Sequence, residues 1–377
     1  MRPGPGSGGP AGANLGAVRS HNTALVLGLL RDAGAQGISR LELAERTGLT
    51  PQAVSKITAR LREEGLAAEA GRRASTGGKP RTVLRLVPDA GHAVGVHLDR
   101  DELRVVLVDL DGAVVGERRT ELDLGAGAQA VLAVVAGAVQ GLVADRLGLG
   151  GEGLARVGTL LGVGVALPGP LDHARGVLHR VTGFPEWDGF PLRDALVERL
   201  GVPVVVDKDT NAAALGLAVA GEGGSFAYLH LGTGLGAGLV IGGHVHRGAR
   251  TGAGEFGHQV VQLDGPLCEC GNRGCVEVLC LTAVGRGQHA EAARVLGVGA
   301  ANLVGLLDID VVLLGGRTVA GAPEVFVRGV GEVLGARARR EGVLGGTVPV
   351  GLAPGGELVV AEGAAQLLLA PLFGREA

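Results

Sequence analysis

Residues 91–122 read GHAVGVHLDRDELRVVLVDLDGAVVGERRTEL, and this stretch decides the fold of most of the chain. It has the pattern of three strands joined by short turns, and an apolar helical run follows over residues 128–145. A second group of three strand-like segments begins with SFAYLHLG at residues 225–232, and the buried-type strand GVGVAL, residues 162–167, lies between the groups. The repeat predicts two related α/β lobes facing each other across a cleft, where ligands bind in such folds.

The chain is long enough for more than one domain. Its 377 residues predict two or three domains, and its hydrophobic content of 46% suffices for more than one buried core. No apolar run reaches the ~18 residues that a membrane span requires, and the run 24–30 is too short and too deep for a signal peptide. We therefore expect a cytoplasmic globular protein.

The charge is distributed unevenly along the chain. Residues 1–88 carry 11 arginines and two lysines against six acids, a balance of +7, which leaves −10 of the total of −3 for residues 89–377. A compact basic segment joined to an acidic body is typical of a nucleic-acid reader attached to a second domain. A basic but inert end remains the alternative on charge alone.

The N-terminal part divides into two segments. Residues 1–16 are rich in glycine and proline and lack hydrophobic periodicity, which predicts a disordered tail. Residues 17–88 then form one predicted domain, and residues 89–377 form the second, with its two lobes at about 89–205 and 206–377.

Three short helices and a hairpin are predicted in the first of these domains. Apolar residues have helical spacing from 21 to 33, Ser39 can cap a second helix, and Thr50 followed by proline starts a third. The segment 66–86 then has the pattern of a strand, a basic glycine-rich turn and a strand. A helix-turn-helix followed by a hairpin is a winged helix.

A winged helix places its third helix in the major groove of DNA and its wing on phosphate or in the minor groove. The candidate DNA contacts are Gln52, Ser55, Lys56 and Arg60 of the helix, and Arg72, Arg73, Lys79 and Arg81 of the wing. Gln52 and Lys56 are the candidates for base reading. A three-helix protein-interaction module is the alternative, but it gives the wing's charges no purpose.

All four cysteines lie within CECGNRGCVEVLC, residues 268–280. Four thiols could form two disulfides, but so tight a cluster in a reducing compartment is more often a metal site. The sequence thus indicates a metal in the second half of the chain.

Taken together, these segments resemble the ROK family (repressors, open reading frames, kinases), and specifically its transcriptional regulators. The resemblance runs from about His21 to the C-terminus. The motifs that carry it, besides the winged helix, are VALPGPLD (165–172), FPEWDGFPL (184–192), DKDTNAAALG (207–216), LGTGLGAGLVIGG (231–243), GEFGH (254–258), CECGNRGCVE (268–277) and DIDVVLLGG (308–316). It implies a winged helix-turn-helix followed by a two-lobed, actin-like and sugar-kinase-like domain of ribonuclease H-like topology.

The resemblance also implies one structural zinc ion. Its ligands map to His258, Cys268, Cys270 and Cys275. Three thiolates and one imidazole close a tetrahedral shell, so the metal has no open position for catalysis. Cys280 is left over, and we expect it to be a buried small hydrophobic residue.

In the same way, Glu255, His258 and Glu277 are expected to point toward a sugar, since each can accept hydrogen bonds from its hydroxyl groups. Asp209 matches the family's catalytic base, here expected to be vestigial. Lys208 stands where the family usually has asparagine. It either pairs with a neighbouring aspartate, residue 207 or 209, or meets an anionic effector such as a sugar phosphate.

A sugar kinase with an accessory DNA-binding domain is the alternative function. Kinases of the family carry an Asp-x-Gly-Gly-Thr turn after the first strand, whereas residues 97–101 read HLDRD here. The carboxylates of Asp99 and Asp101 would repel phosphate, and without glycines the backbone cannot approach it closely. We therefore expect no phosphoryl transfer.

The predicted function is a sugar-responsive DNA-binding regulator, most simply a repressor. Its expected partners are an operator in duplex DNA, a sugar or sugar derivative, and further copies of the chain, since two half-sites favour a dimer. Only 37 residues separate Glu277 from Gly315, fewer than is usual in the family. A regulator that has lost its response to the effector is therefore a further possibility.

Overall fold

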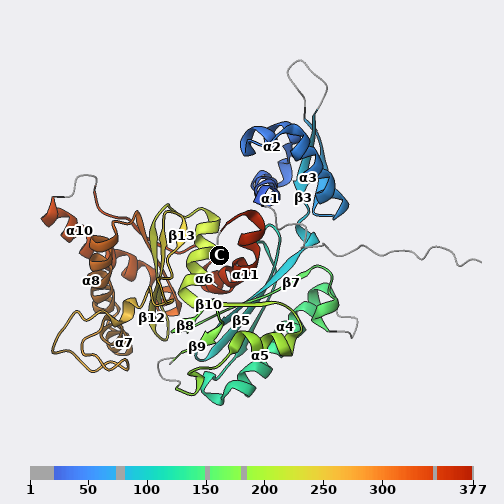
Figure 1. Cartoon of the computed structure of the whole chain (residues 1–377). Helices are drawn as coiled ribbons and strands as arrows, with labels where there is room; N and C mark the ends of the chain where they lie inside the picture. The colour runs from blue at the N-terminus through green and yellow to red at the C-terminus, as the bar shows by residue number, and fades with distance from the viewer. Residues whose placement is uncertain (1–20, 74–80, 149–152, 180–184, 343–345, 376–377) are drawn as a thin grey trace, which may run out of the picture.

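The computed structural model describes residues 21–73, 81–148, 153–179, 185–342 and 346–375 (Figure 1). The predicted tail at 1–16 lies outside these residues, as do Lys79 and the side chains of Arg72 and Arg73.

A winged helix forms the N-terminal domain, as the sequence predicts. Its elements are α1 (His21–Ala33), β1 (Ile38–Ser39), α2 (Arg40–Thr47), α3 (Pro51–Glu63), β2 (Ala67–Arg73) and β3 (Arg81–Leu86), with the strands in the order β1-β3-β2. Local signals set the helix ends. The Ser39 side chain and Glu42 form a capping box at α2, and the Thr50 hydroxyl accepts a hydrogen bond from the Ala53 N–H at α3.

The first lobe is a five-stranded sheet in the order β10-β7-β4-β5-β6. Its strands are β4 (His92–Leu98), β5 (Glu102–Asp109), β6 (Val114–Glu121), β7 (Leu160–Leu167) and β10 (Val204–Lys208). The meander β4-β5-β6 is antiparallel, whereas β7 and β10 are parallel to β4. A short hairpin of β8 (Leu171–Asp172) and β9 (Val177–Leu178) follows β7.

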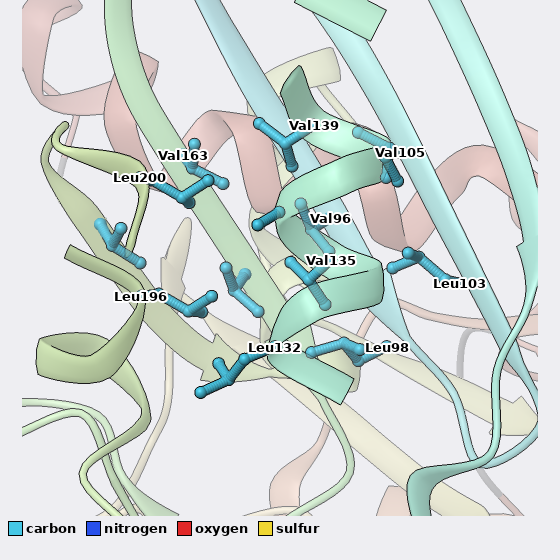
Figure 2. Packing of buried hydrophobic residues seen from close by; sticks show 14 of the residues in the cluster. Val96, Leu98, Leu103, Val105, Leu132, Val135, Val139, Val163, Leu196 and Leu200 are labelled. Carbon is cyan, nitrogen blue, oxygen red and sulfur yellow. The ribbon is translucent and has the colours of Figure 1, made fainter. Parts of the chain in front are cut away.

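Two helices cover one face of this sheet: α4 (Ala128–Leu147) and α5 (Leu192–Leu200). Figure 2 shows Leu132, Val135 and Val139 of α4 packed toward the valines and leucines of β4 and β5. These side chains are withdrawn from water, and such burial contributes about 25 cal/mol per Å² of apolar surface. The ends of β4 and β10 at the cleft are therefore anchored in this core through Leu98 and Val206.

The second lobe repeats this topology. Its sheet has the order β13-β12-β11-β14-β15, again an antiparallel meander followed by two parallel strands. The strands are β11 (Phe226–Leu231), β12 (Leu235–Ile241), β13 (His244–Val245), β14 (Val311–Gly315) and β15 (Val350–Leu352). The helices are α7 (Val276–Gly285), α8 (His289–Leu307), α9 (Arg317–Gly321) and α10 (Pro323–Glu341). The repeat predicted from the two meanders is confirmed.

Helices α6 (Asp209–Ala220) and α11 (Val359–Leu369) lie side by side between the two sheets (Figure 1). Glycines permit the close packing. A Cβ on Gly363 would lie 2.0 Å from the Ala212 carbonyl oxygen of α6, and a Cβ on Gly95 would lie 1.9 Å from the Ala361 oxygen of α11. Helix α11 thus packs on the first sheet although it comes from the end of the chain.

Two features show how the parts of the chain are joined. Strand β10, which spans the lobe boundary expected at about 205, continues to Lys208, because residues 207 and 208 still pair with β7. The N-terminal domain also shares its hydrophobic core with the body of the protein. Leu27 and Leu30 of α1 belong to the same cluster as Phe373 in the turn η9 (Ala370–Phe373) that follows α11.

Three helical segments among the described residues are long and apolar enough to cross a membrane by length and composition: α4, α8 and Gly356–Phe373. This differs from the expectation that no apolar stretch is long enough. Packing explains their composition, because α4 is buried on the first sheet, α8 lies in the core of the second lobe, and α11 is enclosed between the lobes.

Candidate functional site

The predicted metal ligands come together at one point. The Cys268 Sγ lies 3.8 Å from the His258 Nδ1, the Cys270 Sγ lies 3.6 Å from the Cys275 Sγ, and all four ligand atoms lie within 4.8 Å of one another. Around a zinc ion with Zn–S bonds of about 2.3 Å, tetrahedral ligand atoms lie about 3.7 Å apart. The donor set and its spacing therefore fit a four-coordinate metal.

The chain forms this cluster by joining two loops. His258 ends the turn η7 (Phe256–His258), and Cys275 immediately precedes α7. Gly274 has a φ of 63° and lies so close to the preceding loop that a Cβ would be 1.7 Å from the Gln262 carbonyl oxygen. Only glycine fits there, which explains the GC pair in the cysteine motif.

Cys280 is not part of the cluster, as predicted. Its side chain is fully buried in the core of the second lobe, with the Sγ 3.4 Å from the Ala292 carbonyl oxygen. Burial raises the pKa of its thiol to about 12, so the sulfur is protonated and chemically inert at neutral pH.

One cavity of about 80 Å³ between the lobes is lined by all the residues predicted to meet an effector. They are Lys208, Asp209, Glu255, His258 and Glu277. Lys208 ends β10 and Asp209 begins α6 on one side, while the other three belong to the loops that the metal cluster joins. The cavity is narrow, so a sugar ring requires some opening of the lobes.

Lys208 has a different partner from either of those expected. Its Nζ donates to the Glu255 Oε1 at 2.7 Å and to the Ala253 carbonyl oxygen at 2.8 Å, and the residue is 3% exposed. Asp207 instead forms an ion pair with Arg247 at 2.7 Å. Pairing with residue 207 or 209 was the wrong prediction, because successive side chains of a strand point to opposite faces.

Glu277 also holds the glycine-rich turn between β11 and β12. Its Oε2 accepts a hydrogen bond from the Leu235 N–H at 2.8 Å, and its Oε1 lies 3.9 Å from the His258 Nδ1. The carboxylate of Asp209 accepts a hydrogen bond from the Thr210 N–H at 2.6 Å. Both acids are thus fixed in orientation at the cavity wall.

The HLDRD turn after β4 is fastened to the opposite lobe. Arg317, at the start of α9, donates to the Asp99 Oδ2 and the Asp101 Oδ2, each at 2.9 Å. The Thr233 hydroxyl donates to the Asp99 Oδ1 at 2.9 Å. We call these contacts of Asp99 and Asp101 with Arg317 and Thr233 the clasp. Hydrogen bonding to Asp101 raises the pKa of Arg317, so its charge is permanent.

Beside the clasp lies a larger cavity of about 280 Å³, lined in part by His97 and His230. Burial lowers the pKa of His97 to about 4, so its imidazole is neutral. Sequence reasoning missed Arg317 and Arg247, because each meets its aspartate from a distant part of the chain and no local pattern marks either one.

The candidate DNA-reading residues have different environments. Gln52, Ser55 and Lys56 are exposed on α3, on the face opposite the buried Val54, Thr58 and Leu61. Arg60 donates to the Thr23 hydroxyl at 2.6 Å, so its guanidinium contacts α1. Arg81 is exposed at the start of β3. The exposed set stays a prediction for DNA contact, and Arg60 has contacts within its own domain.

Known protein families match both parts of the chain. The ROK family model matches residues 93–288, and a winged helix-turn-helix DNA-binding model matches residues 25–67. The DNA-binding transcriptional dual regulator NagC of Escherichia coli K12 is 32% identical over 277 residues, covering 72% of this chain and 64% of NagC. A putative xylose repressor of a Caldicellulosiruptor species is 27% identical over 352 residues, covering 81% of this chain and 85% of that protein.

Two solved structures show the same division. A ROK family transcriptional regulator, a homologue of the E. coli MLC protein, covers 94% of this chain and 98% of its own, with a TM-score of 0.72 at 20% identity. A ROK hexokinase from Thermus thermophilus covers 73% of this chain and 96% of its own, with a TM-score of 0.57 at 29% identity. The regulator thus shares the fold of nearly the whole chain.

Proposed function

Because this chain belongs to the ROK family and carries a winged helix-turn-helix DNA-binding domain, we propose that it is a transcriptional repressor whose operator binding responds to a sugar. The repressors named among its relatives support this proposal. We assign DNA binding to residues 17–88 and effector binding to residues 89–377, in the cytoplasm. The protein acts as a homodimer or a higher oligomer, since a second copy supplies the second half-site.

The clasp is the observation that argues most strongly against phosphoryl transfer. In a sugar kinase of this fold, the turn after the first strand admits phosphates through small residues and backbone N–H groups. Here Asp99 and Asp101 occupy that turn, and both accept hydrogen bonds from Arg317. A nucleotide would have to displace Arg317 and then face two carboxylates, which repel phosphate.

The effector is a neutral sugar rather than an anionic one. The Lys208 ammonium is already paired with Glu255 at 2.7 Å, so it has no unpaired charge for a phosphate or carboxylate. The cavity is also lined by Asp209 and Glu277, whose carboxylates repel an anion. Sugar hydroxyls, by contrast, donate hydrogen bonds to such acceptors.

A structural zinc ion holds the loops of this cleft together. Its ligands are His258, Cys268, Cys270 and Cys275. The cluster joins the loop of Glu255 to the helix of Glu277, so the bound metal would fix the separation of the two acids. The His258 Nδ1 faces the Cys268 sulfur, which leaves the Nε2 for the effector. The metal's role is organisation, because its four protein ligands complete a tetrahedral shell.

Helix α6 connects the effector cleft with the DNA-binding domain. It begins with Asp209 at the cleft, and its last turn accepts hydrogen bonds from Arg375 through the carbonyl oxygens of Ala218 and Val219. The segment that carries Arg375 directly follows η9, whose Phe373 packs on α1. A change of lobe closure that moves α6 therefore changes the support on which the winged helix rests.

DNA footprinting beside the protein's own promoter tests the proposal, with a panel of neutral and phosphorylated sugars. We expect one neutral sugar to release the protein, its phosphate ester to act less well, and ATP to have no effect. A protected site that no sugar changes would show a constitutive DNA binder, and the sugar response would be wrong. ATP-dependent phosphorylation of the releasing sugar would establish the alternative, a kinase that retains Asp209 as its base.

A further inference from the structure

A cavity of about 270 Å³ lies at the junction of the DNA-binding domain and the effector domain. One face of α1, the end of α2, the end of α6 and the segment after η9 form its walls. Three of its lining residues are arginines: Arg31, Arg46 and Arg375. They come from three separate parts of the chain, so no local sequence pattern marks the site. It is distinct from the effector cleft, which lies at the other end of α6.

Two of these arginines are held in position by uncharged partners. The Arg31 guanidinium lies 4.8 Å from the centre of the Phe373 ring and donates to the Asp111 carbonyl oxygen at 3.1 Å. Arg375 donates to the carbonyl oxygens of Ala218 and Val219 at 3.2 and 3.0 Å. Carbonyl groups satisfy N–H donors but do not neutralise a charge, so both guanidinium groups are oriented and still cationic.

The charge of the cavity is positive. The part of its lining that the structure describes holds three arginines and one acid, Asp32, which gives 3 − 1 = +2. Among the described residues, none of the three arginines forms an ion pair within 4.0 Å. Burial, and then the charge of Arg375, lowers the pKa of Arg31, while Asp111 and Asp32 oppose part of this effect. The two arginines therefore repel each other across the junction.

We propose that this cavity binds a small oxyanion, either inorganic phosphate or the phosphate group of a small metabolite, between Arg31, Arg46 and Arg375. The planar guanidinium group presents paired N–H donors that match phosphate oxygens, and charge-assisted hydrogen bonds of this kind are among the strongest in proteins. A bound anion relieves the repulsion between Arg31 and Arg375.

The site would tie the two domains together. Arg31 and Arg46 belong to the DNA-binding domain, whereas Arg375 belongs to the C-terminal segment fastened to α6. An anion that contacts all three stabilises the domain arrangement seen here relative to any arrangement in which α1 leaves η9. The protein thus has a second ligand site, separate from the sugar site, at the junction between its domains.

Calorimetric titration of the full-length protein with inorganic phosphate, at constant ionic strength in sodium chloride and without DNA or sugar, tests the proposal. We expect saturable binding and a rise of the melting temperature. Arg46→Gln and Arg375→Gln should each weaken phosphate binding about tenfold, the effect of one charge-assisted hydrogen bond. Arg328→Gln is the matched control, because Arg328 is exposed on α10, in the other lobe.

Absence of saturable binding, or wild-type phosphate affinity in both arginine variants, overturns the proposal. A second arm uses random duplex DNA in place of phosphate. If free phosphate does not bind while both variants weaken duplex binding, the arginines contact the DNA backbone and the free-anion site is wrong. Because the phosphate arm contains neither DNA nor sugar, its failure leaves the repressor proposal intact.

Discussion

At the scale of single residues, Lys208 and Glu255 form a pair whose two members have different access to water. The Lys208 side chain is 4% exposed and that of Glu255 is 42% exposed. An unpaired charge is costly only where water cannot reach it. Removing Glu255 should therefore cost more stability than removing Lys208, although either change breaks the same contact.

We expect Glu255→Ala to destabilise the protein by about 3 kcal/mol, because it leaves a buried ammonium with only the Ala253 carbonyl oxygen. Lys208→Asn should cost about 1 kcal/mol, because the Glu255 carboxylate can turn to water. Chemical denaturation of both variants measures the difference. Equal losses would mean that Lys208 is hydrated in solution.

The exposed residues of α3 give a second prediction at this scale. Lys56→Ala should reduce discrimination between operator and random DNA by about 1 to 3 kcal/mol, the value of one good base contact. Arg81→Ala at the wing is the comparison, and it should weaken binding to both DNAs alike, because phosphate contacts carry no sequence information. Competition binding at a fixed salt concentration measures both. Equal losses for Lys56→Ala on the two DNAs would remove it from the base-reading set.

At the scale of elements, the metal loop can be tested by removing one ligand. Cys270→Ser should abolish metal binding and loosen the loop that positions Glu277, because the metal's binding energy organises that loop. The N-terminal domain should stay folded. Elemental analysis and sugar titration measure the effects. Cys280→Ala is the control and should retain the metal, because the Cys280 sulfur lies in the hydrophobic core. Native protein without zinc would contradict the assignment.

The packing of α6 on α11 makes another prediction for an element. Gly363→Ala would place a Cβ 2.0 Å from the Ala212 carbonyl oxygen, so the two helices must separate. We expect a loss of about 1 to 3 kcal/mol, typical of overpacking. Gly137→Ala on α4 is the control, since a Cβ there meets no atom within 4 Å. It should stabilise by about 0.5 to 1 kcal/mol through helix propensity. Thermal unfolding of both variants measures these effects. A neutral Gly363→Ala would refute the close packing.

The elements that the sequence predicted well are those with local signals. The caps at Ser39 and Thr50 predicted the starts of α2 and α3. The close spacing of the cysteines indicated a metal site, and the family resemblance supplied its four ligands, which lie together in the structure. Features that depend on distant contacts were missed or misplaced. Lys208 is 47 residues from its partner Glu255, and α11 joins the first sheet from the far end of the chain. No periodicity or spacing reports such a contact.

At the scale of the whole molecule, polar contacts join the lobes on both sides of the effector cleft. Asp207 with Arg247 and Lys208 with Glu255 lie on one side. The clasp of Asp99 and Asp101 with Arg317 lies on the other. Helices α6 and α11 form the layer between the sheets. A change in lobe closure should therefore also change the position of the winged helix.

Removing the clasp should shift the lobes toward an open arrangement. Arg317→Ala removes the cation that attracts Asp99 and Asp101 to α9, so nothing balances their charge across the gap between the turn and the second lobe. Because the Arg317 side chain is 42% exposed, the loss of stability should be only about 1 kcal/mol. The effect on lobe closure should be larger than the effect on stability, because the clasp forms only when the lobes meet. Because a sugar ring requires the narrow effector cavity to open, the variant should bind the sugar about fivefold more tightly. Small-angle scattering and sugar titration of the full-length protein measure the two effects.

Arg294→Ala is the matched control, since Arg294 pairs with Glu291 within α8 and does not join the lobes. Unchanged scattering and sugar affinity in Arg317→Ala would show that the other contacts between the lobes hold them closed without the clasp.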